Sequence, residues 1–227
     1  MSSIDSTNPA NRKAKKAVKK EWRLLLIDDH PMIRRGVRET LENERDLNIV
    51  DEASTEAEAL DKARSTAPDL AVTDISLENG SGLELIKQLR SQNPDLRILV
   101  LSIHDEELYA ERTLRAGANG YIQKSEPADQ LIKGIRTALT GGTALSPRMT
   151  DRLVQQAVTT DSNESKGVEG LSDRELEVFH QIGSGLGTRQ IAERMCISIK
   201  TVETHRENIK KKLGIHSAAE LSRYAVT

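Results

Sequence analysis

The sequence is poor in cysteine and aromatic residues, and it has no long apolar run. A single cysteine, Cys196, excludes a disulfide framework, and its place in an apolar stretch predicts a small buried side chain. Aromatic residues make up only 2% of the chain, so any core must be built from Leu, Ile, Val and Ala. No apolar run approaches the ~20 residues of a membrane span, and the N-terminus lacks a signal-peptide h-region. We therefore expect a cytoplasmic protein that has no membrane partner.

Charge is unevenly distributed along the 227 residues, although the net charge is only −2. Residues 1–20 carry six bases and one acid, residues 21–170 eighteen bases and twenty-seven acids, and residues 171–227 nine bases and seven acids. An acidic central block beside a mildly basic C-terminal block indicates two domains with different partners. The basic run at the N-terminus predicts a disordered solvated tail, with an auxiliary electrostatic arm on DNA as the alternative.

Short apolar runs alternate with segments of helical period between residues 22 and 140. The apolar runs predict five strands, at 23–27, 47–53, 70–75, 96–102 and 119–123. The amphipathic segments predict five helices, at 31–43, 55–66, 82–91, 105–116 and 127–140. Almost wholly apolar strands joined by helices form a parallel sheet that is covered on both faces. The pattern therefore predicts a five-stranded, doubly wound α/β domain of the flavodoxin-like type, whose site lies at the carboxyl ends of the strands.

The C-terminal part of the chain has a helical pattern. Residues 146–158 predict a short helix, and the small, polar stretch 159–170 predicts an exposed linker. Four further segments predict a small all-α four-helix domain, at 172–183, 188–195, 199–213 and 217–226. Because Ser198 is the expected N-cap of the third segment after a tight turn, the second and third segments form a helix-turn-helix.

Segment 199–213 should bury one face and expose the other. At about 100° per residue, Val202, Ile209 and Leu213 share a stripe that should face the core. The opposite face is either a solvated surface or a surface that reads DNA, and it consists of Lys200, Thr204, Glu207 and Lys211, flanked by Glu203 and Asn208.

Chemically reactive residues fall where the predicted strands end. Asp28 and Asp29 follow the first strand, Asp74 ends the third, Ser102 ends the fourth and Lys124 follows the fifth. In a parallel sheet these ends share one edge, so the side chains should converge. Clustered carboxylates repel one another unless a cation neutralises them, and an open site of oxygen ligands favours Mg²⁺. With Mg²⁺ bound, Asp74 can attack a phosphoryl donor while Lys124 and the Ser102 hydroxyl hold the transferring oxygens.

Residues 22–140 resemble the receiver domain of bacterial two-component response regulators. The resemblance rests on DDH at 28–30, TDISLENGSGLELI at 73–86, LSIHD at 101–105 and AGANGYIQKSE at 116–126. It implies that Asp74 is the phosphoacceptor, and that Asp29 and the Ser76 backbone carbonyl join it as direct Mg²⁺ ligands. Asp28 would act close behind them through water.

The same resemblance implies that Ser102 and Lys124 bind the phosphoryl group, and that Tyr121 is an aromatic switch that turns inward when Ser102 moves. Two positions depart from the receiver pattern. Glu78 stands where many receivers have proline, and Ser125 follows Lys124 where proline is usual. Both changes alter loop stiffness and the tendency to a cis peptide, so they put the dephosphorylation rate in doubt.

Residues 171–216 resemble the LuxR-type helix-turn-helix, and the whole chain resembles the NarL/FixJ family. The motif TVETHRENIKKKLGI at 201–215 is specific enough to indicate this module by itself. The expected DNA-contacting residues are Lys200, Thr201, Glu203, Thr204, Glu207, Asn208, Lys210 and Lys211. The expected domains are a basic tail at 1–21, a receiver at 22–141, a linker at 142–169 and the helix-turn-helix domain at 170–227.

The resemblance also implies partners. A sensor histidine kinase, or a phosphotransfer protein, would phosphorylate the chain, which would bind double-stranded DNA. A homodimer is expected when the chain is phosphorylated or bound to DNA, because affinity should depend on pairing two subunits.

Two alternatives belong to other classes of protein. Haloacid-dehalogenase phosphatases also use Asp, Ser or Thr, Lys and Mg²⁺, but their nucleophile follows the first strand as DxD. Here the acidic pair, Asp28 and Asp29, comes before Asp74 in the chain. Position 76 is Ser, so no general acid stands two residues beyond Asp74. We therefore do not expect an enzyme. The other alternative is a regulator that acts through protein contacts because its output domain has lost DNA affinity. Binding to its own promoter region would distinguish it.

Overall fold

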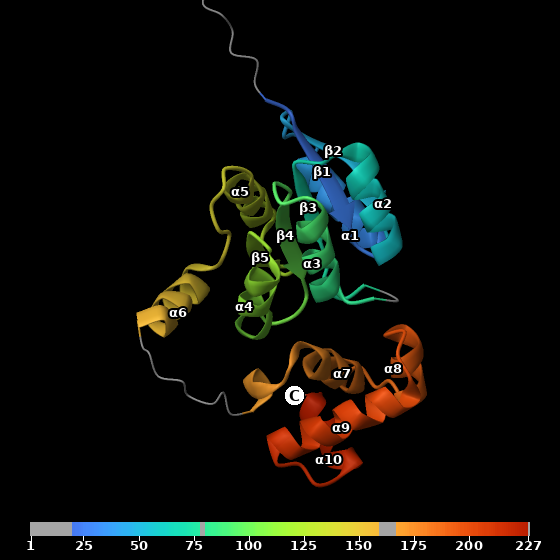
Figure 1. Cartoon of the computed structure of the whole chain (residues 1–227). Helices are drawn as coiled ribbons and strands as arrows, with labels where there is room; N and C mark the ends of the chain where they lie inside the picture. The colour runs from blue at the N-terminus through green and yellow to red at the C-terminus, as the bar shows by residue number, and fades with distance from the viewer. Residues whose placement is uncertain (1–19, 78–79, 159–166, 227) are drawn as a thin grey trace, which may run out of the picture.

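The computed structural model describes residues 20–77, 80–158 and 167–226. They form an α/β domain followed by a helical domain (Figure 1). The predicted basic tail up to residue 19, the position of Glu78 and residues 159–166 of the predicted linker lie outside the described residues.

Five parallel strands form the sheet of the α/β domain, in the order β2–β1–β3–β4–β5. The strands are β1 (Trp22–Ile27), β2 (Leu47–Ala53), β3 (Leu70–Thr73), β4 (Arg97–Ser102) and β5 (Gly120–Gln123). From β1 the chain first moves to β2 on one side, and then crosses to β3, β4 and β5 on the other side. The topological switch point, where ligands bind in such sheets, therefore lies between the carboxyl ends of β1 and β3. The predicted fold class of this domain is therefore confirmed.

Each face of the sheet has its own apolar core. The helices of this domain are α1 (Pro31–Leu41), α2 (Glu56–Thr66), α3 (Gly82–Gln92), α4 (Glu106–Ala116) and α5 (Ala128–Leu139). Leu24 and Leu26 of β1 pack in the core with residues of α1 and α5. Leu25 and Ile27 pack in the other core with residues of α2, α3 and α4. The alternation of strand side chains thus buries β1 from both sides, as its almost wholly apolar sequence predicts.

Part of the expected linker packs against the α/β domain. Ala144 pairs with Gly120 at the edge of β5. Helix α6 (Pro147–Val158) follows and buries Met149, which is 1% exposed. The first part of the expected linker, up to the end of α6, is therefore structured in the described residues.

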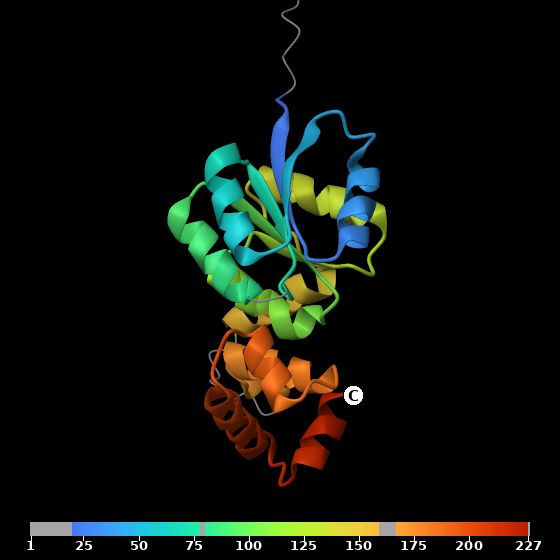
Figure 2. The same cartoon turned by 90° about the vertical axis from the view of Figure 1, so that its right-hand side faces the viewer.

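The helical domain contains α7 (Asp173–Gly183), α8 (Thr188–Arg194), α9 (Ile199–Leu213) and α10 (Ala218–Ala225), preceded by a 3₁₀ turn at Val168–Gly170. Val202 and Ile209 of α9 are fully buried, as predicted, and Leu213 is half-buried. Helices α7 and α8 face the α/β domain, whereas α9 and α10 lie on the far side (Figures 1 and 2). No helix of the described segments is long and apolar enough to cross a bilayer.

The prediction of a buried Cys196 is wrong. Its side chain is exposed, and its φ is +53°, in the left-handed region. This residue forms the turn after α8, so it does not belong to the inner face of that helix. Ile191 and Met195 fill the core instead. The tight turn before Ser198 is where the sequence predicts it, but the side chain of Cys196 is exposed at that turn and does not lie in the core.

Candidate functional site

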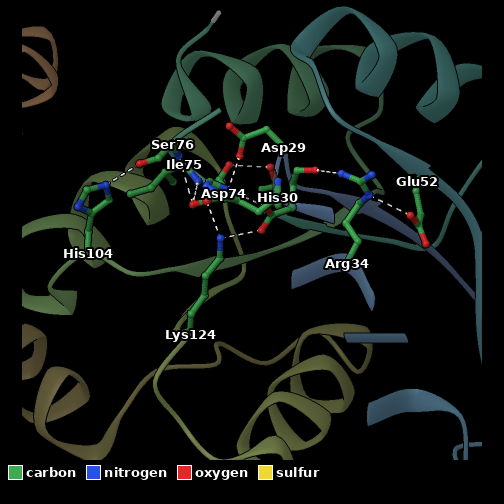
Figure 3. A network of polar contacts seen from close by, with 11 residues as sticks. Asp29, His30, Arg34, Glu52, Asp74, Ile75, Ser76, His104 and Lys124 are labelled. Carbon is green, nitrogen blue, oxygen red and sulfur yellow. Dashed lines mark hydrogen bonds and ion pairs between the residues drawn. The ribbon is translucent and has the colours of Figure 1, made fainter. Parts of the chain in front are cut away.

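The carboxyl ends of β1, β3 and β5 bring acidic and basic side chains together (Figure 3). Asp28, Asp29 and His30 follow β1, and Asp74 follows β3. One ligand atom from each of these four residues lies within 4.8 Å of the others. Asp28 and Asp74 are each 2% exposed, so their charges are largely removed from water.

Lys124 supplies the positive charge of this cluster. Its ammonium lies 2.6 Å from Oδ2 of Asp28 and 2.6 Å from Oδ2 of Asp74. Burial opposes the charged form of Lys124, but the carboxylates of Asp74 and Asp28 outweigh burial and raise the pKa of the lysine. One buried cation therefore bridges two of the three carboxylates.

The backbone after β3 holds the second oxygen of Asp74. Oδ1 accepts hydrogen bonds from the N–H groups of Ile75, at 2.6 Å, and Ser76, at 3.2 Å. Gly82, the first residue of α3, packs so closely on this loop that a Cβ there would lie 2.2 Å from Cα of Ile75. Only glycine fits at this position, and the contact fixes the loop that orients Asp74.

The donor set of the cluster suits a divalent cation. Three carboxylates offer the hard oxygen ligands that Mg²⁺ prefers. His30 Nδ1 lies 2.7 Å from Oδ1 of Asp29, and the His30 side chain is 61% exposed. His30 was not among the predicted site residues, although it is the last residue of the DDH motif.

His104 connects the remaining site residues. Its Nε2 lies 2.5 Å from Oγ of Ser76, and its backbone N–H donates to Oγ of Ser102 at 3.3 Å. The Tyr121 hydroxyl donates to the His104 carbonyl at 2.9 Å. Burial lowers the pKa of His104, against Asp74, which raises it. His104 was not among the predicted site residues, because a histidine in a loop after a strand carries no pattern of its own.

Ser102 and Tyr121 both lie inside the protein. Ser102 is 0% exposed and Tyr121 is 1% exposed. The Tyr121 ring lies inward in this structure, and burial raises the pKa of its hydroxyl. No cis peptide occurs in the described segments, so the bond from Lys124 to Ser125 is trans.

Helix α9 presents most of the expected DNA-contacting residues to solvent. Its N-terminus is capped by Ser198, whose Oγ accepts the Thr201 N–H at 3.0 Å. The exposed residues are Lys200, Thr201, Glu203, Thr204, Glu207, Asn208 and Lys211. Lys210 is different, because its side chain is 20% exposed and its ammonium lies 2.8 Å from Oε1 of Glu207. The Thr204 hydroxyl donates to the Lys200 carbonyl at 2.9 Å, so its oxygen can still accept a hydrogen bond.

Two families match the chain in separate regions. The family described as "Response regulator receiver domain" matches residues 24–136, and "Bacterial regulatory proteins, luxR family" matches residues 169–225. The chain is similar to the oxygen regulatory protein NreC of Staphylococcus carnosus (strain TM300), at 37% identity over 209 residues that cover 90% of this chain and 96% of that protein. NreC of Staphylococcus aureus (strain MRSA252) is 36% identical over the same shares of both chains.

Solved structures of response regulators share the fold, over all or part of this chain. RcsB from Salmonella enterica serovar Typhimurium, bound to the promoter rprA with the phosphomimetic BeF₃⁻, has a TM-score of 0.69 at 24% identity, over 92% of this chain and 100% of that one. A LuxR-family two-component response regulator from Aurantimonas sp. SI85-9A1 is 32% identical, with a TM-score of 0.57, over 61% of this chain and 99% of that one. The likeness to RcsB shows a common fold.

Proposed function

The chain belongs to the NarL/FixJ family of response regulators and is a DNA-binding transcriptional regulator, and on this premise we propose that phosphorylation of Asp74 controls its binding to DNA. The observation that carries the proposal is the bridge from Lys124 to Asp28 and Asp74. The acceptor of a receiver is a buried carboxylate at the carboxyl ends of the parallel strands, with a cation beside it. Asp74 has this position and this neighbour.

Phosphoryl transfer to Asp74 would form a bond between a carboxylate oxygen and phosphorus. The phosphorus–nitrogen bond of a phosphohistidine on the sensor kinase, or on a phosphotransfer protein, would break, and the electron pair would return to the imidazole. Oδ2 would be the attacking oxygen, because Oδ1 is held by the backbone N–H groups of Ile75 and Ser76. Lys124 would pass from Oδ2 to an oxygen of the transferred group.

The residues that would hold Mg²⁺ are Asp28, Asp29, Asp74 and the backbone carbonyl of Ser76. Bound there, the ion would offset the charge that builds up as a phosphoryl group approaches three carboxylates. Asp28 would take part through water, because its Oδ2 is engaged by Lys124 and its Oδ1 accepts the His30 N–H at 2.8 Å.

The output of the protein would be the insertion of α9 into the major groove of DNA. Thr201, Thr204 and Asn208 can reach base edges, and Lys200 and Lys211 can reach phosphates. Glu203 and Glu207 can accept from cytosine but repel the backbone, so we expect a homodimer to reach useful affinity. We assign the receiver to residues 22–141 and the DNA-binding domain to 170–227, and we place the protein in the cytoplasm.

Labelling with an acyl phosphate tests the proposal. Wild type and Asp74→Asn are incubated with acetyl phosphate and Mg²⁺, with and without EDTA, and resolved by intact mass. We expect one phosphoryl group on the wild type, none on Asp74→Asn and none with EDTA. Asp129→Asn, at an exposed position of α5, is the matched control and should label like the wild type. Labelling of Asp74→Asn would overturn the assignment.

The same samples test for enzymatic turnover. No carboxylate stands two residues beyond Asp74 to act as general acid, so we expect no sustained release of phosphate from small phosphate esters.

A further inference from the structure

Arg34, in the first turn of α1, contacts the acidic loop, although it was not among the predicted site residues. Its Nη1 donates a hydrogen bond to the backbone carbonyl of Asp28 at 2.6 Å. Its Nε donates to Oε2 of Glu52, near the end of β2, at 2.9 Å. Figure 3 shows the guanidinium between the acidic cluster and Glu52. The side chain of Arg34 is only 19% exposed, so the protein encloses it in this position.

The contact acts on the peptide group that joins Asp28 to Asp29. The N–H of Asp28 donates to the carbonyl of Ala53 in β2 at 3.0 Å. The carbonyl of Asp28 belongs to the next peptide group, and no backbone N–H of the described residues donates to it, so Arg34 is its donor. Because a peptide group is planar, a hydrogen bond that fixes its carbonyl also fixes the Cα atoms on both sides. Arg34 therefore constrains the backbone from which both carboxylates project.

Glu52 holds the guanidinium in the orientation that this contact needs. One of its oxygens accepts from Arg34, and the other accepts from Arg38, one turn further along α1. The backbone of Glu52 is fixed in turn, because it pairs with Leu26 of β1 and its carbonyl accepts a hydrogen bond from Lys62. Burial opposes the charged form of Glu52, but the two arginines outweigh burial and lower the pKa of the carboxyl. The donors of a guanidinium form one rigid fork, so fixing Nε on Glu52 also directs Nη1 toward the loop.

The charge of Arg34 does not explain its position beside the acidic loop. A guanidinium repels a divalent cation that binds nearby, and Glu52 only reduces this repulsion. If charge were the only influence of Arg34, its removal would tighten the binding of Mg²⁺. If Arg34 acts by holding the loop, its removal would weaken the binding. Charge and positioning thus have effects of opposite sign on the affinity for Mg²⁺.

We propose that Arg34 is a positioning residue for the Mg²⁺ site, which acts through the Asp28 carbonyl and is oriented by Glu52. Mg²⁺ demands nearly ideal octahedral geometry, whereas Ca²⁺ accepts longer and more irregular arrangements of oxygen ligands. An arginine that holds Asp28 and Asp29 in place therefore favours Mg²⁺ over Ca²⁺. The inference deepens the proposed function and rests on it, because it takes the acidic cluster as the Mg²⁺ site.

Titration with the two cations measures this effect without phosphorylation. The full chain, labelled with ¹⁵N, is titrated with MgCl₂ and separately with CaCl₂, and the amide chemical shifts of Ile75 and Ser76 give both dissociation constants. The same spectra show whether each variant is folded. We expect Arg34→Ala to bind Mg²⁺ about 10-fold more weakly than the wild type, at the lower end of the usual loss when a metal ligand loses its supporting hydrogen bond. Its affinity for Ca²⁺ should fall by a smaller factor, so that the preference for Mg²⁺ declines.

Two further variants separate positioning from charge. Arg38→Ala removes an equal charge from the same carboxylate and keeps the hydrogen bond between Arg34 and Asp28, so it should retain the wild-type preference for Mg²⁺. Glu52→Gln leaves Arg34 without its anionic partner and should lose part of that preference. In the Arg34→Ala background it should cause no further loss, because both changes act through one contact.

The outcomes distinguish this inference from the proposed function. Tighter or unchanged Mg²⁺ binding by Arg34→Ala, an equal loss for both cations, or the same loss of preference in Arg38→Ala would overturn the inference alone. If Arg34→Ala does not fold, Glu52→Gln is read by the same criteria. No Mg²⁺ binding by the wild type, or wild-type Mg²⁺ binding by Asp29→Asn, would overturn the proposed Mg²⁺ site instead.

Discussion

The Lys124 ammonium lies 2.6 Å from Oδ2 of Asp74, and the two side chains are only 7% and 2% exposed. A buried carboxylate is costly unless it is paired, and here one lysine pairs with Asp74 and Asp28 together. The same ammonium is in place to neutralise a phosphoryl oxygen on Asp74. Stability and phosphoryl transfer therefore depend on one side chain.

Lys124→Met should leave two buried carboxylates without their cation. We expect a loss of about 3–5 kcal/mol in the free energy of unfolding without Mg²⁺, and a partial recovery when Mg²⁺ is added. The rate of labelling by acetyl phosphate should fall by about 100-fold or more. Urea unfolding and intact mass measure the two effects. Lys133→Met, at an exposed position of α5, should change neither, and wild-type labelling by Lys124→Met would contradict the role of the lysine.

Ser102→Ala should weaken the coupling between the receiver and DNA. Phosphorylation can raise DNA affinity only by the differential stability of two receiver states, usually about 5–150-fold. The Ser102 hydroxyl accepts the His104 N–H, and the Tyr121 hydroxyl donates to the His104 carbonyl. The gain in DNA affinity on phosphorylation should therefore fall toward zero in Ser102→Ala. Fluorescence anisotropy with operator DNA, on fully phosphorylated samples, gives the comparison. Ser65→Ala on the exposed face of α2 is the control, and an equal gain in Ser102→Ala would remove Ser102 from the switch.

Replacement of Thr204 and replacement of Lys211 should change DNA binding in different ways. Thr204→Ala should change the preference among operator variants by about 1 kcal/mol and leave the salt dependence unaltered, as expected for a contact to a base edge. Lys211→Ala should weaken all sequences alike and reduce the salt slope by about one unit per subunit, as expected for a phosphate contact. Titrations at three salt concentrations on matched and scrambled DNA separate them. The reverse pattern would mean that α9 lies in the groove with the opposite polarity.

Acid should destabilise the protein through His180 of α7, whose ring lies 4.5 Å from the ring of His104, centroid to centroid. Burial and the nearby His104 lower the pKa of His180 to about 4 in the folded protein, below the value of about 6.5 expected for the unfolded chain. The folded state therefore binds fewer protons between these values. Stability is therefore complete above about pH 6.5 and declines as the pH falls toward 4, with a loss of about 1 kcal/mol at pH 5.5.

The charged and titratable groups around His180 are His104, Tyr109, Glu177 and Arg194. His104 has a lowered pKa and acts in the same direction, so its effect adds to that of His180. Thermal unfolding of the wild type and His180→Phe at pH 7.5 and 5.5 isolates the contribution of His180. We expect the wild type to lose more stability on acidification, and an equal loss would contradict the assignment.

Periodicity in the sequence predicted every strand of the sheet to within three residues at each end. Nearly wholly apolar strands such as Leu24–Ile27 can only be buried on both sides, and this requirement determines the layers. The convergence of Asp28, Asp74 and Lys124 followed from the same topology. The carboxyl ends of parallel strands lie at one edge of the sheet, whatever the exact positions of the helices.

Contacts between the domains were beyond prediction from the sequence. His104 and His180 are 76 positions apart, and neither belongs to a periodic pattern. Their contact depends on how one folded domain docks on another, which local propensity does not determine. The burial of Cys196 was predicted wrongly although the turn that contains it was predicted, because apolar neighbours do not show that the residue adopts a left-handed conformation with an exposed side chain.

The most direct test of the account is DNA affinity as a function of phosphorylation at Asp74. Wild type and Asp74→Asn are each titrated onto operator DNA selected from the genome, with and without acetyl phosphate and Mg²⁺. The account predicts a gain of at least about 5-fold for the phosphorylated wild type and none for Asp74→Asn. Equal affinity of the wild type in both conditions, or an equal gain in Asp74→Asn, would contradict it.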